Sequence, residues 1–127
     1  MRVVDTSAWI EWFVNSPAGA EIRQHLPAPD DWLVPTIVQL ELAKWLMREV
    51  GEDAADRTIA LSSTFQVAPL QTSIALSAAH INAVNKLATA DAIVYATALA
   101  YGADVLTCDA GFHGLPGVIL VAKSSGG

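Results

Sequence analysis

The stretch Arg2-Val3-Val4-Asp5-Thr6-Ser7 places two β-branched apolar residues directly before an acid and two hydroxyl side chains. Adjacent valines are typical of a short buried strand, and the acid that follows them marks the end of that strand. Ser7 is a suitable N-cap for a helix, which we predict over residues 8–15. A strand that leads directly into a helix is the first unit of an alternating α/β fold.

Strand and helix patterns continue to alternate along the rest of the chain. We expect further strands over residues 32–34, 66–70, 104–107 and 118–121. Between them we expect helices over residues 18–26, 35–50, 52–65, 72–87 and 89–102, the last one capped by Thr89. Short, continuously apolar strands that alternate with helices predict a central, mostly parallel sheet flanked by helices on both faces.

The composition indicates one ordered domain. Of the 127 residues, 53% are apolar and 16% are charged, a balance that favours a folded core over disorder. We predict a domain over residues 1–122 and a flexible tail over residues 123–127. The single cysteine, Cys108, excludes an internal disulfide and a cysteine-based zinc site. No stretch resembles a signal peptide or a membrane span, so we expect a soluble, cytoplasmic protein with no membrane partner.

The charge balance constrains the choice of partner. Seven basic and 13 acidic residues give a net charge of −6, the wrong sign for simple electrostatic capture of nucleic acid. If four of the acids hold two divalent cations, the total becomes about −2. An acidic surface also suits a basic protein partner.

Two acids follow predicted strands of the sheet. Asp5 ends the first strand, and Asp109 comes two residues after the strand over residues 104–107. In open parallel sheets, ligands bind outside the carboxyl ends of the strands, so both positions are candidate site residues. The alternative is that each aspartate caps the helix or turn that follows it.

Two more acids lie in predicted helices with apolar surroundings. Glu41 is in the middle of the helix over residues 35–50, which is apolar enough on all sides that we expect it to be largely buried. A carboxylate in such a helix needs a charged partner or a metal. At about 100° per residue, Arg48 and Lys44 fall within about 20° and about 60° of Glu41, so an ion pair is the alternative. Asp91 is in the first turn of the helix that follows Thr89, where the helix dipole alone favours an acid.

The four acids together predict more than each does alone. Carboxylate oxygens are the ligands that Mg²⁺ and Mn²⁺ prefer, and four carboxylates brought close together would repel one another without a cation. Asp5 and Asp91 could hold one ion that activates a water, with Glu41 and Asp109 completing the coordination or orienting waters. A second ion, if present, would stabilise the leaving oxygen. One or two ions per site are compatible with this pattern.

Other chemistries fit the sequence less well. His25, His80 and His113 occur in unrelated contexts without metal-ligand spacing, and Cys108 is best explained as a small buried residue. A haloacid-dehalogenase-type phosphatase would need a second aspartate two residues after Asp5, where this chain has Ser7. The alternative from another class is a catalytically silent binding module whose acids are structural.

Four segments of the chain resemble a known family. They are Val3-Val4-Asp5-Thr6-Ser7, the isolated Glu41, Thr89-Ala90-Asp91-Ala92 with Ala96-Thr97-Ala98 after it, and Leu106-Thr107-Cys108-Asp109-Ala110-Gly111-Phe112. In this order and at this spacing they resemble the PIN domain. Together with the small size, they look like a VapC-type toxin of a bacterial toxin–antitoxin pair.

The resemblance spans residues 1 to about 121 and implies a specific set of properties. It implies a Rossmann-like α/β/α fold and endoribonuclease activity on single-stranded or looped RNA with Mg²⁺ or Mn²⁺. It also implies a homodimer that a cognate antitoxin inhibits. Matched residue by residue, the acidic quartet is Asp5, Glu41, Asp91 and Asp109, with Thr6 and Thr107 as supporting hydroxyls.

A homodimer is also suggested by the apolar residues themselves. The helix over residues 35–50 is more apolar than a small monomer easily covers, and Trp9, Trp12 and Trp45 add large apolar area.

Overall fold

A computed structural model describes residues 1–123 and contains a five-stranded sheet in the order β3-β2-β1-β4-β5. All strand pairs are parallel, which confirms the predicted α/β class. The central strand β1 pairs with both neighbours, so that Val3 lies opposite Leu33 on one side and Val105 on the other. The strands are β1 (Arg2–Val4), β2 (Trp32–Pro35), β3 (Gln66–Ala68), β4 (Asp104–Thr107) and β5 (Val118–Leu120). Of the predicted tail over residues 123–127, residues 124–127 lie outside the described residues.

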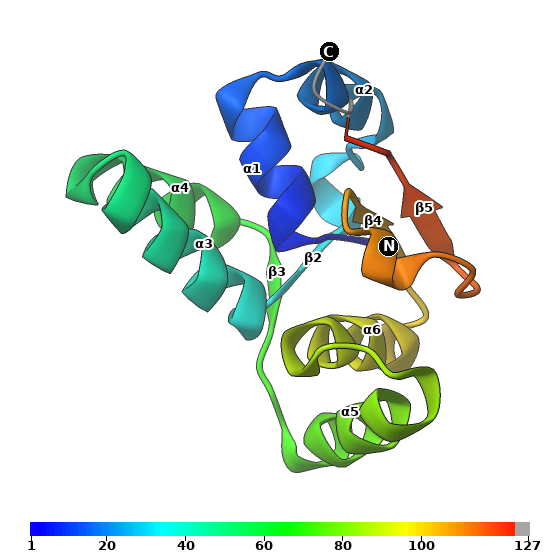
Figure 1. Cartoon of the computed structure of the whole chain (residues 1–127). Helices are drawn as coiled ribbons and strands as arrows, with labels where there is room; N and C mark the ends of the chain where they lie inside the picture. The colour runs from blue at the N-terminus through cyan, green and yellow to red at the C-terminus, as the bar shows by residue number, and fades with distance from the viewer. Residues whose placement is uncertain (124–127) are drawn as a thin grey trace.

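Helices cover both faces of the sheet, as predicted. Figure 1 shows α1 and α2 on one side of the strands and α5 and α6 on the opposite side, while the α3–α4 hairpin extends away from the sheet. The helices are α1 (Thr6–Val14), α2 (Pro17–His25), α3 (Thr36–Glu49), α4 (Glu52–Ser62), α5 (Thr72–Asn85) and α6 (Thr89–Tyr101). Short 3₁₀ turns, Pro29–Asp31 and Ala110–Phe112, complete the chain. Within residues 1–123, no helix is long and apolar enough to cross a membrane.

The two predicted helix caps are wrong. Helix α1 already begins at Thr6, with Asp5 as its N-cap residue, and the Ser7 hydroxyl instead bonds to the Asp5 carboxylate. Helix α6 begins at Thr89 itself, with Ala88 as the N-cap residue and no side-chain cap. In the first case, the Ser7 hydroxyl bonds to a carboxylate of the site and is not available to cap the helix backbone.

The core lies between the sheet and the two helical layers. Its centre consists of fully buried strand residues such as Val3, Leu33 and Leu106. Trp9, on α1, packs against Trp32 with ring centroids 5.1 Å apart. Trp32 in turn stacks on Phe65 with ring centroids 4.5 Å apart. These aromatic contacts hold α1 against β2 and the start of β3, and they thereby fix the segment that carries Asp5 and Thr6.

The expectation that the helix over residues 35–50 is largely buried is wrong. Helix α3 buries only one stripe, Val38, Leu42 and Leu46, whereas Leu40 is 59% and Met47 is 54% exposed. The reason is the position of the α3–α4 hairpin, which packs on the rest of the domain along one side only (Figure 1). Glu41 is therefore partly buried, at the edge of the packed stripe.

Candidate active site

Asp5 is the most buried acid of the structure, with 3% of its surface exposed at the carboxyl end of β1. Its Oδ2 accepts hydrogen bonds from Thr107 Oγ1 at 2.8 Å and from Ser7 Oγ at 2.9 Å. Burial raises the pKa of the Asp5 carboxyl, and the hydrogen bonds from Thr107 and Ser7 oppose that rise. The carboxylate is thus held in one orientation by side chains from β4 and α1.

Asp109 follows β4 and is tied to the same network. Its N–H donates to Thr107 Oγ1 at 2.9 Å, and its Oδ1 accepts from the N–H of Gly111 at 2.8 Å. A Cβ atom at Gly111 would lie 3.1 Å from Asp109 Oδ1 and 3.5 Å from Asp91 Oδ2. Oxygens of Asp109 and Asp91 therefore border one small space, which a glycine keeps open.

Asp91 lies in the first turn of α6 and is half-buried against the other acids. Its pKa is raised to about 8 by burial first, then by a hydrogen bond and charge repulsion from Asp109, and finally by the charges of Asp5 and Glu41. Asp91 therefore keeps a proton near neutral pH. Because all three other acids act on Asp91, the fold brings the four predicted carboxylates to one end of the sheet.

Glu41 reaches this region from α3. Its Oε1 accepts a 2.8 Å hydrogen bond from Thr6 Oγ1, the residue next to Asp5. The alternative ion pair with Lys44 or Arg48 does not form in the described part of the chain, where Arg48 pairs with Glu49 at 2.8 Å instead. Thr6 and Thr107, the two predicted supporting hydroxyls, thus each donate to an acid of the quartet.

Among the described residues, the acids of the quartet have no cationic partner. Between residues 1 and 123 the ion pairs are Arg2–Asp104 and Arg48–Glu49, and neither includes a member of the quartet. No three Asp, Glu, His or Cys side chains in that range are close enough to form a ready-made metal site. The cluster thus offers oxygen donors that repel one another, as Asp91 shows, without being closed around an ion.

Ser7 is the site residue that sequence reasoning missed. Its Oγ contacts Asp5 Oδ2, lies 3.1 Å from Thr107 Oγ1 and accepts the N–H of Cys108 at 2.9 Å. The sequence signal was a hydroxyl two residues after the acid at a strand end. Cys108 is buried as predicted, and its burial raises the thiol pKa to about 11, which keeps it protonated and unreactive.

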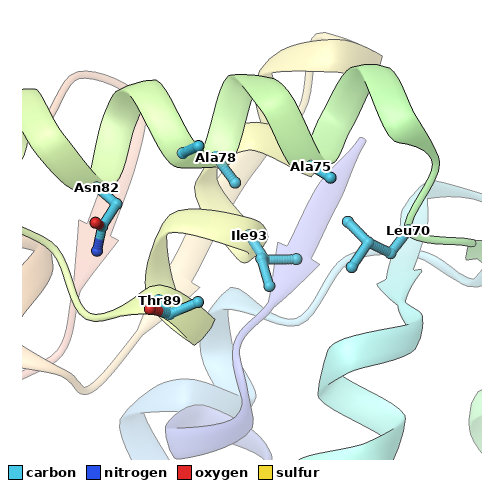
Figure 2. Close-up of a pocket in the computed structure, with 7 residues that line it drawn as sticks. Leu70, Ala75, Ala78, Asn82, Thr89 and Ile93 are labelled. Atoms are coloured by element: carbon cyan, nitrogen blue, oxygen red, sulfur yellow. The ribbon is translucent and has the colours of Figure 1, made fainter.

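Hollows lie on both sides of the acids. One of about 580 Å³ is bordered by Ser7, Asp109 and Lys123, and one of about 380 Å³ lies between α1 and α3 beside Thr6 and Glu41. A third, of about 350 Å³, is separate from the acids. Figure 2 shows it between α5 and α6, with Ala75, Ala78 and Asn82 facing Thr89 and Ile93.

A comparison with protein families shows which family has this arrangement. A family model described as the PIN domain matches residues 2–118. The chain belongs to the PIN domain family. This confirms the resemblance drawn from the sequence and covers every element that carries the acidic quartet. The comparison with curated proteins found no match.

Solved structures share the fold of this PIN domain over most of its length. A toxin–antitoxin complex from Klebsiella pneumoniae has a TM-score of 0.81 at 22% identity, covering 97% of this chain and 99% of that one. DNA-bound VapBC from Salmonella typhimurium has a TM-score of 0.72 at 16% identity, covering 94% and 95%. Mycobacterium tuberculosis VapC20, described as a sarcin–ricin loop cleaving toxin, has a TM-score of 0.69 at 19% identity, covering 85% and 88%. At these identities the likeness concerns the fold.

Proposed function

We propose that this PIN domain is a metal-dependent endoribonuclease that cleaves single-stranded or looped RNA and acts as the toxin of a toxin–antitoxin pair. The observation that carries the proposal is the gathering of four acids at one end of the sheet, where Thr107 holds Asp5, Thr6 holds Glu41, and oxygens of Asp91 and Asp109 border one space beside Gly111. Burial and the three neighbouring acids raise the pKa of Asp91 to about 8. A cluster of acids that keeps no Lys or Arg partner within residues 1–123 is costly for the fold, which favours a functional reason for it.

The residues of the cluster fit Mg²⁺ or Mn²⁺ in their chemistry. All donors are carboxylate or hydroxyl oxygens, and these ions are usually held by few carboxylates while waters and substrate phosphate fill the remaining positions. Asp5 and Asp91 would hold the first ion, and Glu41 and Asp109 would complete the coordination of one or two ions or orient waters. When bound, the metal lowers the pKa of a water and stabilises charge on the leaving oxygen.

The chain's own residues then prepare the site for attack by water. Thr107 and Ser7 keep Asp5 in place, and Thr6 holds Glu41 beside it. The proton on Asp91 must leave before this carboxylate can act as a ligand. Water attack forms a new P–O bond and breaks the bond to the 3′-oxygen, which takes up a proton. The products are a 5′-phosphate and a 3′-hydroxyl.

The toxin role brings partners with it. Solved proteins of the same fold are described as members of toxin–antitoxin complexes. A chain with a net charge of −6 suits a basic segment of an antitoxin, which would also neutralise the acids of the site. Its RNA substrate would place this activity in the cytoplasm.

A homodimer is part of the proposal, and we place its surface on α5 and α6 rather than on α3 and the tryptophans. Trp9 is 2% exposed and belongs to the core, so it cannot serve as a subunit contact. The two most exposed large apolar side chains lie on α5, Leu76 at 68% and Val84 at 63%, and Leu99 on the neighbouring α6 is 55% exposed. Helix α5 carries no Asp, Glu, Lys or Arg between Thr72 and Asn85 and borders the apolar groove of Figure 2. A second copy would cover this face.

Purified protein and an end-labelled RNA test the proposal. Cleavage should require Mg²⁺ or Mn²⁺, stop with EDTA and be absent in Asp91→Asn. The second candidate, a catalytically silent PIN-like module whose acids are structural, is favoured by the lack of a ready-made three-ligand group in residues 1–123. Such a module would cleave no RNA and would show no Mn²⁺-dependent change in stability.

A further inference from the structure

A hollow of about 380 Å³ runs along one face of α3, next to the acidic site. Its lining residues on α3 are Ile37, Leu40, Glu41, Lys44, Trp45 and Arg48, and the spacing of three and four places them on one side of the helix. Helix α1 closes the other side with Thr6 and Ile10. Because Thr6 and Glu41 also belong to the acidic site, the hollow and the site are continuous.

Two cations line this hollow in a protein that carries only seven Lys and Arg residues against 13 acids. Lys44 is exposed and makes no side-chain hydrogen bond to any residue between 1 and 123. Arg48 is 62% exposed and meets Glu49 through Nε. Neither cation is used to neutralise Glu41. Both therefore keep donors available for an anion that reaches the hollow from the site.

We propose that this hollow holds the RNA strand next to the scissile phosphate, with Lys44 and Arg48 on backbone phosphates and Trp45 beneath a base. The inference rests on the proposed ribonuclease function and names the surface that receives its substrate. The hollow extends seven residues from Glu41 to Arg48, a rise of roughly 10 Å. At about 3.4 Å per stacked nucleotide, this is enough for about three nucleotides.

The combination of side chains favours RNA over an acidic peptide. Cations that follow the backbone, next to an aromatic side chain on which a base can stack, are typical of single-strand binding. An acidic peptide would have no use for the aromatic side chain. Phosphate contacts outside the site would also hold the strand in register while the acids await a metal. The negative net charge of the whole chain is then overcome locally.

The test measures binding of end-labelled single-stranded RNA by fluorescence anisotropy in Mg²⁺. All proteins are full-length and carry Asp91→Asn, so that the RNA stays intact. The test variant adds Lys44→Gln and Arg48→Gln. The matched control adds Arg23→Gln and Arg57→Gln, which remove the same charge from exposed positions on α2 and α4. We expect the test variant to bind roughly tenfold more weakly, and its log–log salt slope to shrink by about 1.4, or 0.7 per lost phosphate contact. The control should retain its affinity and slope.

Unchanged affinity in the test variant, or equal losses in both variants, would overturn the inference. Cleavage by the protein without Asp91→Asn is measured in parallel and tests the ribonuclease proposal separately. Trp45→Leu examines the base contact. It should weaken RNA binding several-fold and leave binding of inorganic polyphosphate, which has no bases, unchanged. Equal weakening for both ligands would exclude a base on Trp45.

Discussion

Thr107 Oγ1 donates a 2.8 Å hydrogen bond to Asp5 Oδ2 and so joins two residues that are 102 positions apart in the chain. The same oxygen accepts the N–H of Asp109 at 2.9 Å. Thr107 is fully buried, and Asp5 has no Lys or Arg partner in the described structure. One hydroxyl therefore satisfies a buried acid and positions a second one.

Thr107→Val tests this role with almost no change in side-chain shape. The Asp5 carboxylate loses a donor and the Asp109 N–H loses an acceptor, so unfolding should become easier by about 1–3 kcal/mol. Cleavage should fall as Asp5 loses its fixed orientation, and Thr107→Ser should restore both. Thr97→Val is the control, because that buried hydroxyl bonds only to Ile93 O of its own helix. Equal destabilisation by the two valines would contradict a special role for Thr107.

The pKa of Asp91 predicts a pH dependence of stability without metal. The folded state raises this pKa to about 8 from 3.8, so the folded protein binds a proton that the unfolded chain has already released. Stability from Asp91 is therefore greatest below about pH 4 and is lost as pH rises toward 8. Urea unfolding in EDTA from pH 4 to 8 should show this decline in the wild type. Asp91→Asn should flatten it, and an equally steep decline in that variant would refute the assignment.

Metal binding should offset the charge repulsion among the four acids. At pH 9, where Asp91 is charged, Asp91→Asn removes one charge and should raise the melting temperature in EDTA, because the repulsion of Asp91 by Asp5, Asp109 and Glu41 is lost. In the wild type, Mn²⁺ at about 100 times its Kd should stabilise the fold by about 2.7 kcal/mol, and this gain should vanish in Asp91→Asn. Asp53→Asn, at an exposed position on α4, should keep the full response. A variant that melts several degrees lower without metal would indicate structural acids instead.

The ends of the cleaved RNA report the chemistry. A metal-activated water leaves a 5′-phosphate and a 3′-hydroxyl, whereas attack by the substrate's own 2′-hydroxyl leaves a 2′,3′-cyclic or 3′-phosphate. We expect the first pair, and cleavage should tolerate a 2′-deoxy substitution at the scissile nucleotide. Phosphatase- and ligase-based mapping of the products distinguishes the two. Cyclic phosphate ends, or full activity in EDTA, would rule out the mechanism.

Sedimentation at micromolar concentration tests the proposed dimer. The wild type should sediment as a dimer, and Leu76→Asp should shift it to a monomer by placing a charge in the uncharged face of α5. Met47→Asp, at an exposed apolar position on α3, should leave the dimer intact. If only Met47→Asp dissociates it, the interface lies on α3. A wild-type monomer would refute the dimer altogether.

Sequence reasoning found the parts of the site that depend on local order. Asp5 and Asp109 could be placed because each follows an apolar strand, and parallel strands end at one edge. The partner of Glu41 could not be found in this way. Helical geometry puts Lys44 and Arg48 on the same side of α3 as Glu41, but Thr6 approaches from α1 and makes the contact.

Two other errors have the same origin. Ser7 is a residue type that often caps helices, yet its hydroxyl accepts a hydrogen bond from the Cys108 N–H, 101 residues away. The apolar composition of α3 predicted a largely buried helix. Composition alone does not predict that the α3–α4 hairpin leaves one face of α3 in solvent. Contacts between distant elements decided each of these cases.

The order of the strands also bears on the synthesis of such a protein. Helix pairs such as α1–α2 and α3–α4 can form as the ribosome releases them, because their contacts are local. The central strand β1 is made first, yet its second neighbour, β4, begins only at Asp104. The Thr107 and Asp109 contacts to the first acid follow later still. A nascent or prematurely terminated chain that lacks β4 and Asp109 would therefore carry no assembled site, and the proposed nuclease activity would be absent until these residues have been made.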